Sequence, residues 1–181
     1  MAADTSTTAI RVTVPFAPAV YDGLKRGAER DRREITEFIQ RAVTEYLMEK
    51  GLLEKAEEAR IRLMWKLVDQ AVAAAQKICQ AGGFTAAITL NAIQACMKDP
   101  NWVSGYREFV EDDIYKNGNP RKGVINREIG FRIRAGIGGE TVKGPDGKNA
   151  SAKVLGEIIQ TYTPMADFDR AQFGPGSRQA A

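Results

Sequence analysis

The sequence predicts a mostly α-helical protein with a small β component, that is, an α+β fold. Three observations predict it: long segments repeat apolar residues at helical spacing, one short N-terminal segment alternates apolar and polar residues, and a Pro-Asp-Gly turn indicates a C-terminal hairpin. With 181 residues, 44% of them hydrophobic, the chain can bury a substantial core. We expect a domain over residues 1–51, a helical segment over 52–99, a basic α+β domain over 100–165 and a disordered tail over 166–181.

The first ordered element is expected to be a short strand over residues 10–14, where apolar and polar side chains alternate ahead of Pro15. Its apolar side would carry Ile10, Val12 and Val14. Its polar side would carry Arg11 and Thr13. A strand this short is marginal by itself, and no clear partner strand follows in the next hundred residues. The simplest partner is the same strand from a second copy of the chain.

Two helices are expected next, separated by a short polar turn. The first covers residues 18–30, with Pro18 in its first turn, where proline is tolerated. The second covers residues 34–50 and ends at Gly51, a typical C-cap residue. Its apolar residues follow the i, i+3, i+4, i+7 series without a gap. They are Ile35, Phe38, Ile39, Ala42, Val43, Tyr46 and Leu47.

This order of strand, helix, polar turn and helix resembles the ribbon-helix-helix family of DNA-binding proteins. The resemblance covers residues 8–51 and is carried by IRVTVP at 10–15, the turn at 30–33 and EITEFIQRAVTEYL at 34–47. The apolar stripe of the first helix also fits, with Val20, Leu24 and Ala28. The resemblance implies an intertwined homodimer whose two strands pair antiparallel and lie in the major groove of double-stranded DNA.

The groove-facing positions of the family correspond here to Ala9, Arg11 and Thr13. An arginine can make a bidentate contact to guanine, and a threonine can bond a base or touch a thymine methyl group. Alanine contributes only shape, so specificity would depend on Arg11 and Thr13. The alternative is an ordinary edge strand with a solvated arginine, but the two helices behind it favour DNA binding.

The resemblance also implies a phosphate contact at the start of the second helix, where backbone N–H groups are free. The residues involved would be Arg32, Arg33, Ile35 and Thr36. Two positions depart from the family pattern. Arg32 stands where the family usually has glycine, and Glu34 replaces a small hydroxyl cap and would repel a phosphate.

The middle of the chain predicts a long helix over residues 52–80 and a second helix over 85–97. One interpretation is a packed helical hairpin. The other is a linker that extends the dimer or builds higher oligomers. Cys79 and Cys96 lie within the helical patterns without metal-site spacing, as expected for buried thiols in a reducing cytoplasm.

The C-terminal region predicts a helix over residues 101–115, a loop over 116–122, a helix over 123–135 and a hairpin pairing 140–143 with 152–162. Between residues 116 and 153, nine lysines and arginines face three acidic residues, a net charge of +6, whereas the remainder of the chain carries −3. Eight of these basic residues form a candidate second nucleic-acid surface: Arg121, Lys122, Arg127, Arg132, Arg134, Lys143, Lys148 and Lys153.

The order of these elements, two helices followed by a basic helix and a basic hairpin, resembles that of a winged-helix domain. The resemblance is to the architecture alone. The alternative is a small α+β domain with an ordinary basic surface, or one that binds protein. The glycines after residue 135 do not match a phosphate-binding loop, because no Gly-Lys-Ser/Thr follows.

The absence of histidine disfavours catalysis, because it excludes Ser-His-Asp and Cys-His arrangements and most zinc sites. We expect neither metal nor cofactor, no membrane segment and a cytoplasmic, nucleoid-associated protein. The expected function is sequence-specific DNA binding, as in a transcriptional repressor. Plasmid partition, conjugation and antitoxin accessory roles use the same mechanism. Two alternatives come from other classes: a protein-assembly module, and an enzyme using carboxylates such as Asp112 and Asp113.

Overall fold

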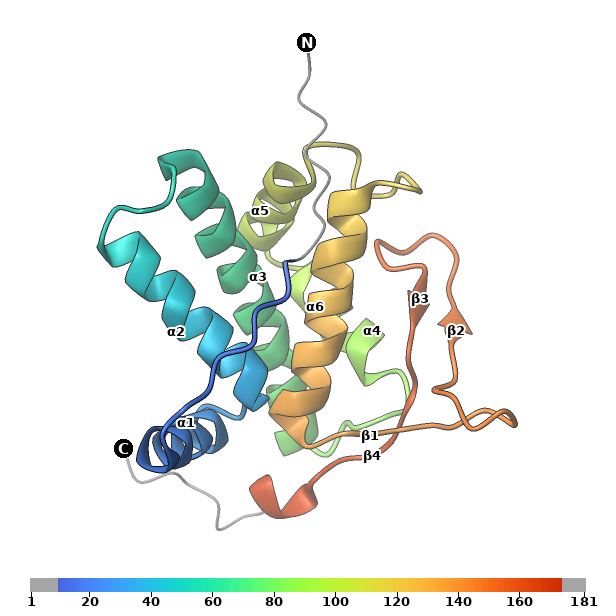
Figure 1. Ribbon diagram of the computed structural model, residues 1–181. Helices are drawn as coiled ribbons and strands as arrows, with labels where there is room; N and C mark the ends of the chain where they lie inside the picture. Colours follow the sequence, from blue (N-terminus) through green and yellow to red (C-terminus); the bar gives the residue numbers. More distant parts are fainter. Residues whose placement is uncertain (1–9, 174–181) are drawn as a thin grey trace.

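A computed structural model describes residues 10–173, and this part of the chain is mostly helical with a small β component, as predicted (Figure 1). The helices are α1 (Pro18–Arg30), α2 (Ile35–Glu49), α3 (Lys55–Gln80), α4 (Ile88–Cys96), α5 (Pro100–Val110) and α6 (Pro120–Ile137). The strands are β1 (Glu140–Thr141), β2 (Ala152–Lys153), β3 (Thr161–Tyr162) and β4 (Met165–Asp167). The predictions for Ala9 and for residues 174–181 lie outside the described residues.

Local sequence signals explain where three helices begin. Pro18, Pro100 and Pro120 each occupy the first turn of a helix, where the missing N–H costs no hydrogen bond. The side chain of Asp99 accepts from the amide of Asn101 at 2.9 Å at the start of α5. Asn119 accepts from the amide of Lys122 at 3.1 Å at the start of α6. These caps satisfy backbone donors that a helix otherwise leaves without partners.

One hydrophobic core unites residues 63–165. Helix α3 lies at its centre and contacts α4, α5 and α6, and its buried side chains include Leu67, Val68 and Ala71. Gly136 lets α6 approach α3 closely, because a Cβ there would lie 2.6 Å from Val72 Cγ1. Buried residues from both 52–99 and 100–165 therefore belong to the same core.

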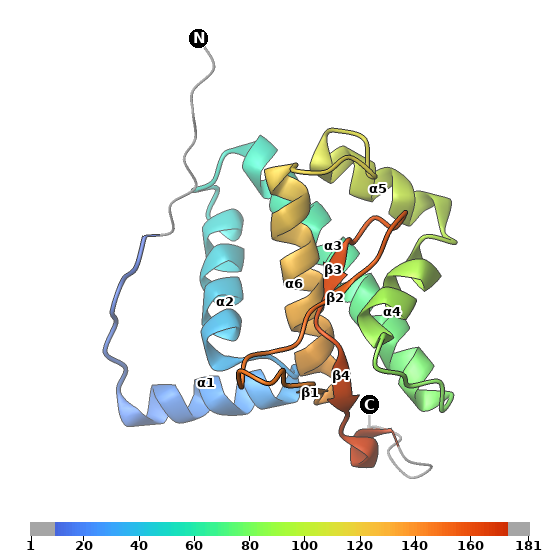
Figure 2. The same ribbon diagram turned by 90° about the vertical axis from the view of Figure 1, so that its right-hand side faces the viewer.

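Helices α1 and α2 form a hairpin beside this core, and α1 runs across the lower end of α2 (Figure 2). The two helices meet at Gly27, where an added Cβ would lie 2.5 Å from the ring of Phe38. The predicted ends of α1 are confirmed at Pro18 and Arg30. After α2, Gly51 adopts φ +65°, the left-handed conformation of a C-cap glycine.

Several helix boundaries differ from the sequence prediction, and two of the differences have a local explanation. Helix α5 ends at Val110 instead of residue 115, because Glu111 adopts the left-handed conformation with φ +51°. Helix α6 begins at Pro120, inside the predicted loop, because Asn119 caps it and Pro120 suits its first position.

The turn of the predicted hairpin is confirmed, but the predicted strand pairing is wrong. The turn forms, since the amide of Gly147 donates to the Gly144 carbonyl at 3.0 Å and Lys143 bridges to Asn149. Beyond the turn, β2 pairs with β3 and β1 pairs with β4, both antiparallel. The segment predicted as one strand contains a second turn, where Gly156 has φ +77°. That turn folds residues 152–162 back on themselves.

Residues 166–173 were predicted to be disordered, but the structure shows them ordered. Strand β4 continues to Asp167, and a 3₁₀ helix covers Arg170–Gln172. Aromatic packing holds this segment: the Phe168 ring lies 4.6 Å from that of Phe84 and 5.7 Å from that of Phe173. Loss of periodicity in the sequence did not reveal these contacts, because Phe84 is distant in the chain.

Candidate nucleic-acid interface

The segment predicted to form a DNA-reading ribbon, residues 10–14, is exposed. Residues 10–14 form no strand within the single chain, so the predicted strand would have to form by pairing with a second copy. Its apolar side chains face solvent, with Ile10 90% and Val12 74% exposed. Arg11 and Thr13 are exposed as well. Both residues predicted to contact bases are therefore accessible on this segment, while Ala9 lies outside the described residues.

The turn before α2 has the backbone that a glycine would favour. Arg32 adopts φ +50°, in the left-handed region where a non-glycine residue is uncommon. Its guanidinium lies 5.8 Å from the centre of the Phe173 ring. The amides of Ile35 and Thr36 lie in the first turn of α2, and Glu34 makes no side-chain cap there. These amides therefore keep the free backbone donors that a phosphate contact requires.

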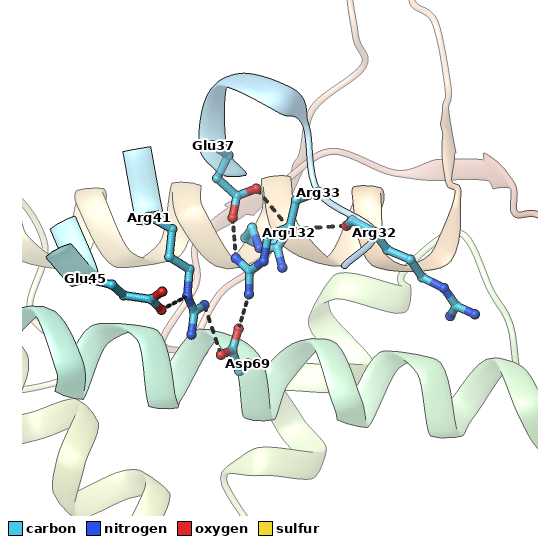
Figure 3. Close-up of polar contacts among 7 residues, drawn as sticks. All are labelled: Arg32, Arg33, Glu37, Arg41, Glu45, Asp69 and Arg132. Carbon is cyan, nitrogen blue, oxygen red and sulfur yellow. Dashed lines mark hydrogen bonds and ion pairs between the residues drawn. The ribbon is translucent and has the colours of Figure 1, made fainter. Parts of the chain in front are cut away.

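Arg33, the other arginine predicted to bind phosphate, is held inside the protein (Figure 3). Its Nη1 lies 2.5 Å from Glu37 Oε1, and its Nη2 lies 3.4 Å from Asp69 Oδ1. Its side chain is 12% exposed. A phosphate would have to compete with two carboxylates for this guanidinium, so Arg33 is placed to hold α2 against α3.

Two more arginines complete this ion-pair network. Arg132 on α6 places Nη1 2.9 Å from Glu37 Oε2 and donates to the carbonyl of Arg32 at 3.4 Å. Arg41 places Nη1 3.2 Å from Asp69 Oδ2, and its guanidinium lies 4.5 Å from the centre of the Trp65 ring. The network therefore links α2 to α3 through Asp69 and to α6 through Arg132 (Figure 3).

Two ion pairs of the network could be predicted from the spacing of their residues in the sequence. Arg33 and Glu37, like Arg41 and Glu45, stand four residues apart and form the pairs typical of helix surfaces. No local signal could identify Asp69 or Arg132 as their partners. Arg132 was predicted on a nucleic-acid surface, but its side chain is only 5% exposed and it serves an internal contact.

The network determines which face of α2 is left outward. Glu37 and Arg41 lie one helical turn apart and face the body of the protein. Val43 and Tyr46 lie on the opposite side of the same helix and are 53% and 56% exposed. A surface helix normally buries its apolar face. Helix α2 instead contacts α3 and α6 through charged side chains and presents much of its apolar face to solvent.

Glu128 on α6 should make stability pH-dependent. Burial is the main cause that raises the pKa of Glu128 above its ordinary value, and the nearby carboxylates of Glu37 and Asp69 raise it further. Arg132 and Arg33 oppose this effect. Between the unfolded and folded pKa values the native state holds more protons, so this group destabilises the fold as pH rises. Glu128→Gln should therefore gain stability relative to the wild type between about pH 4 and pH 7.

Urea unfolding at both ends of that pH range checks the prediction, with Glu29→Gln, at an exposed site on α1, as the matched control. A free-energy difference between Glu128→Gln and the wild type that stays constant with pH would contradict it.

The C-terminal basic residues do not form one surface. Lys122 and Arg132 are buried, and Arg121 pairs with Glu111. Lys143 bonds Asn149 at 2.6 Å, and Lys148 lies 3.8 Å from Asp146. The remaining members of the predicted surface are Arg127, Arg134 and Lys153. The first two line a cleft beside α6, together with Lys122, whereas Lys153 is exposed on β2.

The side chains considered for other chemistry are engaged in packing or ion pairs. Burial raises the pKa of Cys79 and of Cys96 to about 11, so both thiols stay protonated at neutral pH. Asp112 pairs with Lys116 at 2.8 Å, which lowers the pKa of that carboxyl. In residues 10–173, no helix has the length and apolarity required to cross a membrane.

No family model, curated protein or solved structure matches this chain. Its function must be inferred from the residues and from the geometry described above.

Proposed function

We propose that this chain is a homodimeric, sequence-specific DNA-binding protein of the transcriptional-repressor type, associated with the nucleoid. The observation that carries this proposal is the outward apolar face of α2. That face cannot serve the core of its own chain, because the opposite, polar side of the helix is fixed to α3 and α6 by Glu37 and Arg41. A second molecule is required to cover it.

The distribution of exposed apolar side chains supports the same conclusion. Among the described residues, nine of thirteen exposed large hydrophobic side chains lie between residues 10 and 52. Within that segment only Ala28 and Met48 are buried hydrophobic residues. An exposed apolar surface concentrated in one region is typical of an interaction site. The N-terminal segment therefore has the composition of a core but no core of its own.

The partner that fits best is a second copy of this chain. The strand-like segment 10–14 and helix α2 both leave apolar side chains uncovered, including Ile10, Val12 and Val43. Two copies related by a two-fold axis would pair their segments antiparallel and bury these side chains between them. The polar side of each segment, with Arg11 and Thr13, would then face outward on a two-stranded ribbon.

Such a ribbon has the right width for the major groove and carries side chains suited to read bases. The free amides at the start of α2, at Ile35 and Thr36, would contact the phosphate backbone beside it. Arg32 is available nearby, whereas Arg33 is already paired with Glu37 and Asp69. In this arrangement the ribbon supplies specificity and the start of α2 supplies position on the DNA.

Arg11→Ala tests the ribbon directly. Loss of a bidentate base contact should reduce discrimination between specific and random DNA by about 1–3 kcal/mol, with folding unchanged. Specific and random duplexes should be compared by fluorescence anisotropy, after the specific sequence has been selected from random DNA. Arg107→Ala, an exposed arginine on α5, is the control and should leave discrimination unchanged. Undiminished discrimination in Arg11→Ala would exclude the ribbon as the reading element.

The selected sequences provide an independent check. A two-fold symmetric dimer should recover a palindromic site, since each protomer reads one half. A dimer without salt-dependent DNA affinity would instead indicate the assembly module, in which the N-terminal dimer is purely structural.

A second nucleic-acid contact from the C-terminal region, whether or not that region is a winged helix, would depend on the exposed Lys153 and the loop lysines Lys143 and Lys148. Each phosphate neutralised there would add about 0.9 to the salt slope of binding.

A further inference from the structure

The proposed DNA-binding function does not use a cleft of about 670 Å³ beside α6. One wall is α6 between Gly123 and Arg134, and the other is the segment of residues 158–163 that leads into and out of β3. The strands lie alongside α6 in both views (Figures 1 and 2). A volume of this size is typical of small-molecule sites.

The cleft is strongly positive. Its lining includes Lys116, Lys122, Arg127 and Arg134, and it contains no aspartate or glutamate. Lys116 is paired with Asp112, but Arg127 and Arg134 have no carboxylate partner within ion-pair distance among the described residues. Two guanidinium groups are thus free to bind an anion. Arginine is well suited to phosphate, because its planar donors match the geometry of phosphate oxygens.

Lys122 is the most unusual member of this lining. The residue is 6% exposed, and its Nζ donates to the carbonyl of Lys116 at 3.0 Å. No carboxylate in residues 10–173 lies within ion-pair distance of it. Burying a charge without a paired counterion is costly, and burial lowers the pKa of this ammonium against the weaker opposing effect of Asp113. An anion in the cleft would supply the missing negative charge.

Two glycines of α6 also line the cleft, and no close contact within the chain requires glycine at either position. Gly123 and Gly130 lie seven residues apart on the same face of the helix, and a Cβ added at either position would meet nothing within 4 Å. Glycine within a helix is less stable than alanine. Gly136 on the same helix is explained by its contact with Val72, whereas these two are not. They would allow a ligand to approach the helix backbone closely.

The rest of the lining suits a ligand with both polar and aromatic parts. Phe131 is 37% exposed, and the Arg134 guanidinium lies 5.2 Å from its ring centre. Tyr162 on β3 also lines the cleft. Asn117, Gln160 and Thr163 add amide and hydroxyl groups to the lining. Cations, rings and neutral hydrogen-bonding groups together match the chemistry of a nucleotide.

We propose that the cleft between α6 and residues 158–163 binds a phosphate-bearing small molecule of mononucleotide size. Arg127 and Arg134 contact its phosphate groups, Lys122 provides charge from the base of the site, and Gly130 provides the space for close approach. The cleft is concave and lined by these cations, which suits a small ligand better than the convex backbone of a DNA duplex. The proposal does not depend on the N-terminal ribbon.

Titration of the full chain by isothermal calorimetry tests the proposal. The probes are ATP, GTP, CTP, UTP, AMP, pyrophosphate and inorganic phosphate, with adenosine as the uncharged control and a single-stranded oligothymidylate as a competing class. At least one nucleotide should bind saturably, whereas adenosine should not. The Arg127→Ala/Arg134→Ala double variant should weaken that binding roughly tenfold or more, and Arg107→Ala should leave it unchanged.

Gly130→Ala should raise the stability of the protein and lower its affinity for the nucleotide. The added methyl group meets no atom of the chain and improves helix propensity, so the thermal midpoint without ligand should rise. The same methyl group occupies the cleft, so nucleotide affinity should fall roughly tenfold. No saturable nucleotide binding, unchanged affinity in Gly130→Ala, or binding of the oligonucleotide alone would each overturn the proposal. Failure here leaves the Arg11→Ala test of DNA recognition unaffected.

Discussion

Val43→Asp should dissociate the homodimer and abolish specific DNA binding while the single chain stays folded. Val43 is 53% exposed in one chain, so a carboxylate there can remain hydrated in the monomer. In the proposed dimer the same position lies between two apolar faces, where an unpaired charge is costly. A cost of about 3 kcal/mol per dimer would raise its dissociation constant about a hundredfold. Sedimentation velocity and an electrophoretic mobility shift would measure the two effects.

Val124→Asp is the matched control. Val124 is 51% exposed on α6, outside the N-terminal segment, so the same substitution there should leave both the dimer and DNA binding intact. A Val43→Asp protein that remains dimeric would exclude the outward face of α2 as the interface. Loss of the dimer with full retention of specific DNA binding would exclude a ribbon formed by two chains.

Arg132→Ala should have the largest effect on stability, lowering the free energy of unfolding by about 3 kcal/mol. Arg132 is 5% exposed and bonds both Glu37 and the carbonyl of Arg32. Its removal leaves the largely buried Glu37 with one cation fewer, and Glu128 loses a neighbouring positive charge. Urea denaturation, followed by far-ultraviolet circular dichroism, would measure the loss.

Two comparisons separate this effect from simple truncation. Arg62→Ala removes an exposed arginine that pairs with Glu58 at 3.0 Å, and it should cost less than about 1 kcal/mol. A double-mutant cycle of Arg132→Ala with Glu37→Ala should show less loss than the sum of the two single variants. Additive losses would contradict a direct contribution from the Arg132–Glu37 pair.

The helices could be predicted from the sequence because their causes are local. The bounds of α1 and the C-cap at Gly51 agree with the structure, since both depend on residues within a few positions. The start of α6 was missed although the cap Asn119 and Pro120 are themselves local signals, because the cluster of turn residues before them favoured a loop.

The strand pairing could not be predicted in the same way. The turn at Gly144–Gly147 is local and was identified correctly, but the pairing of β1 with β4 joins residues more than twenty positions apart. Residues 166–173 were missed for the same reason, because Phe168 is ordered by packing against Phe84. Contacts of this kind depend on the packed core rather than on sequence pattern.

The sequence by itself determined that α2 has an apolar face and that residues 10–14 carry an alternating pattern without an obvious partner. Only the tertiary structure decided that α2 contacts α3 and α6 through Glu37 and Arg41 and leaves Val43 outward. It also separated the basic residues, burying Arg132 in an ion-pair network and placing Arg127 in a cleft. The physical reason is that periodicity records which side chains share a face, whereas the partner of each face is chosen by long-range packing and charge pairing.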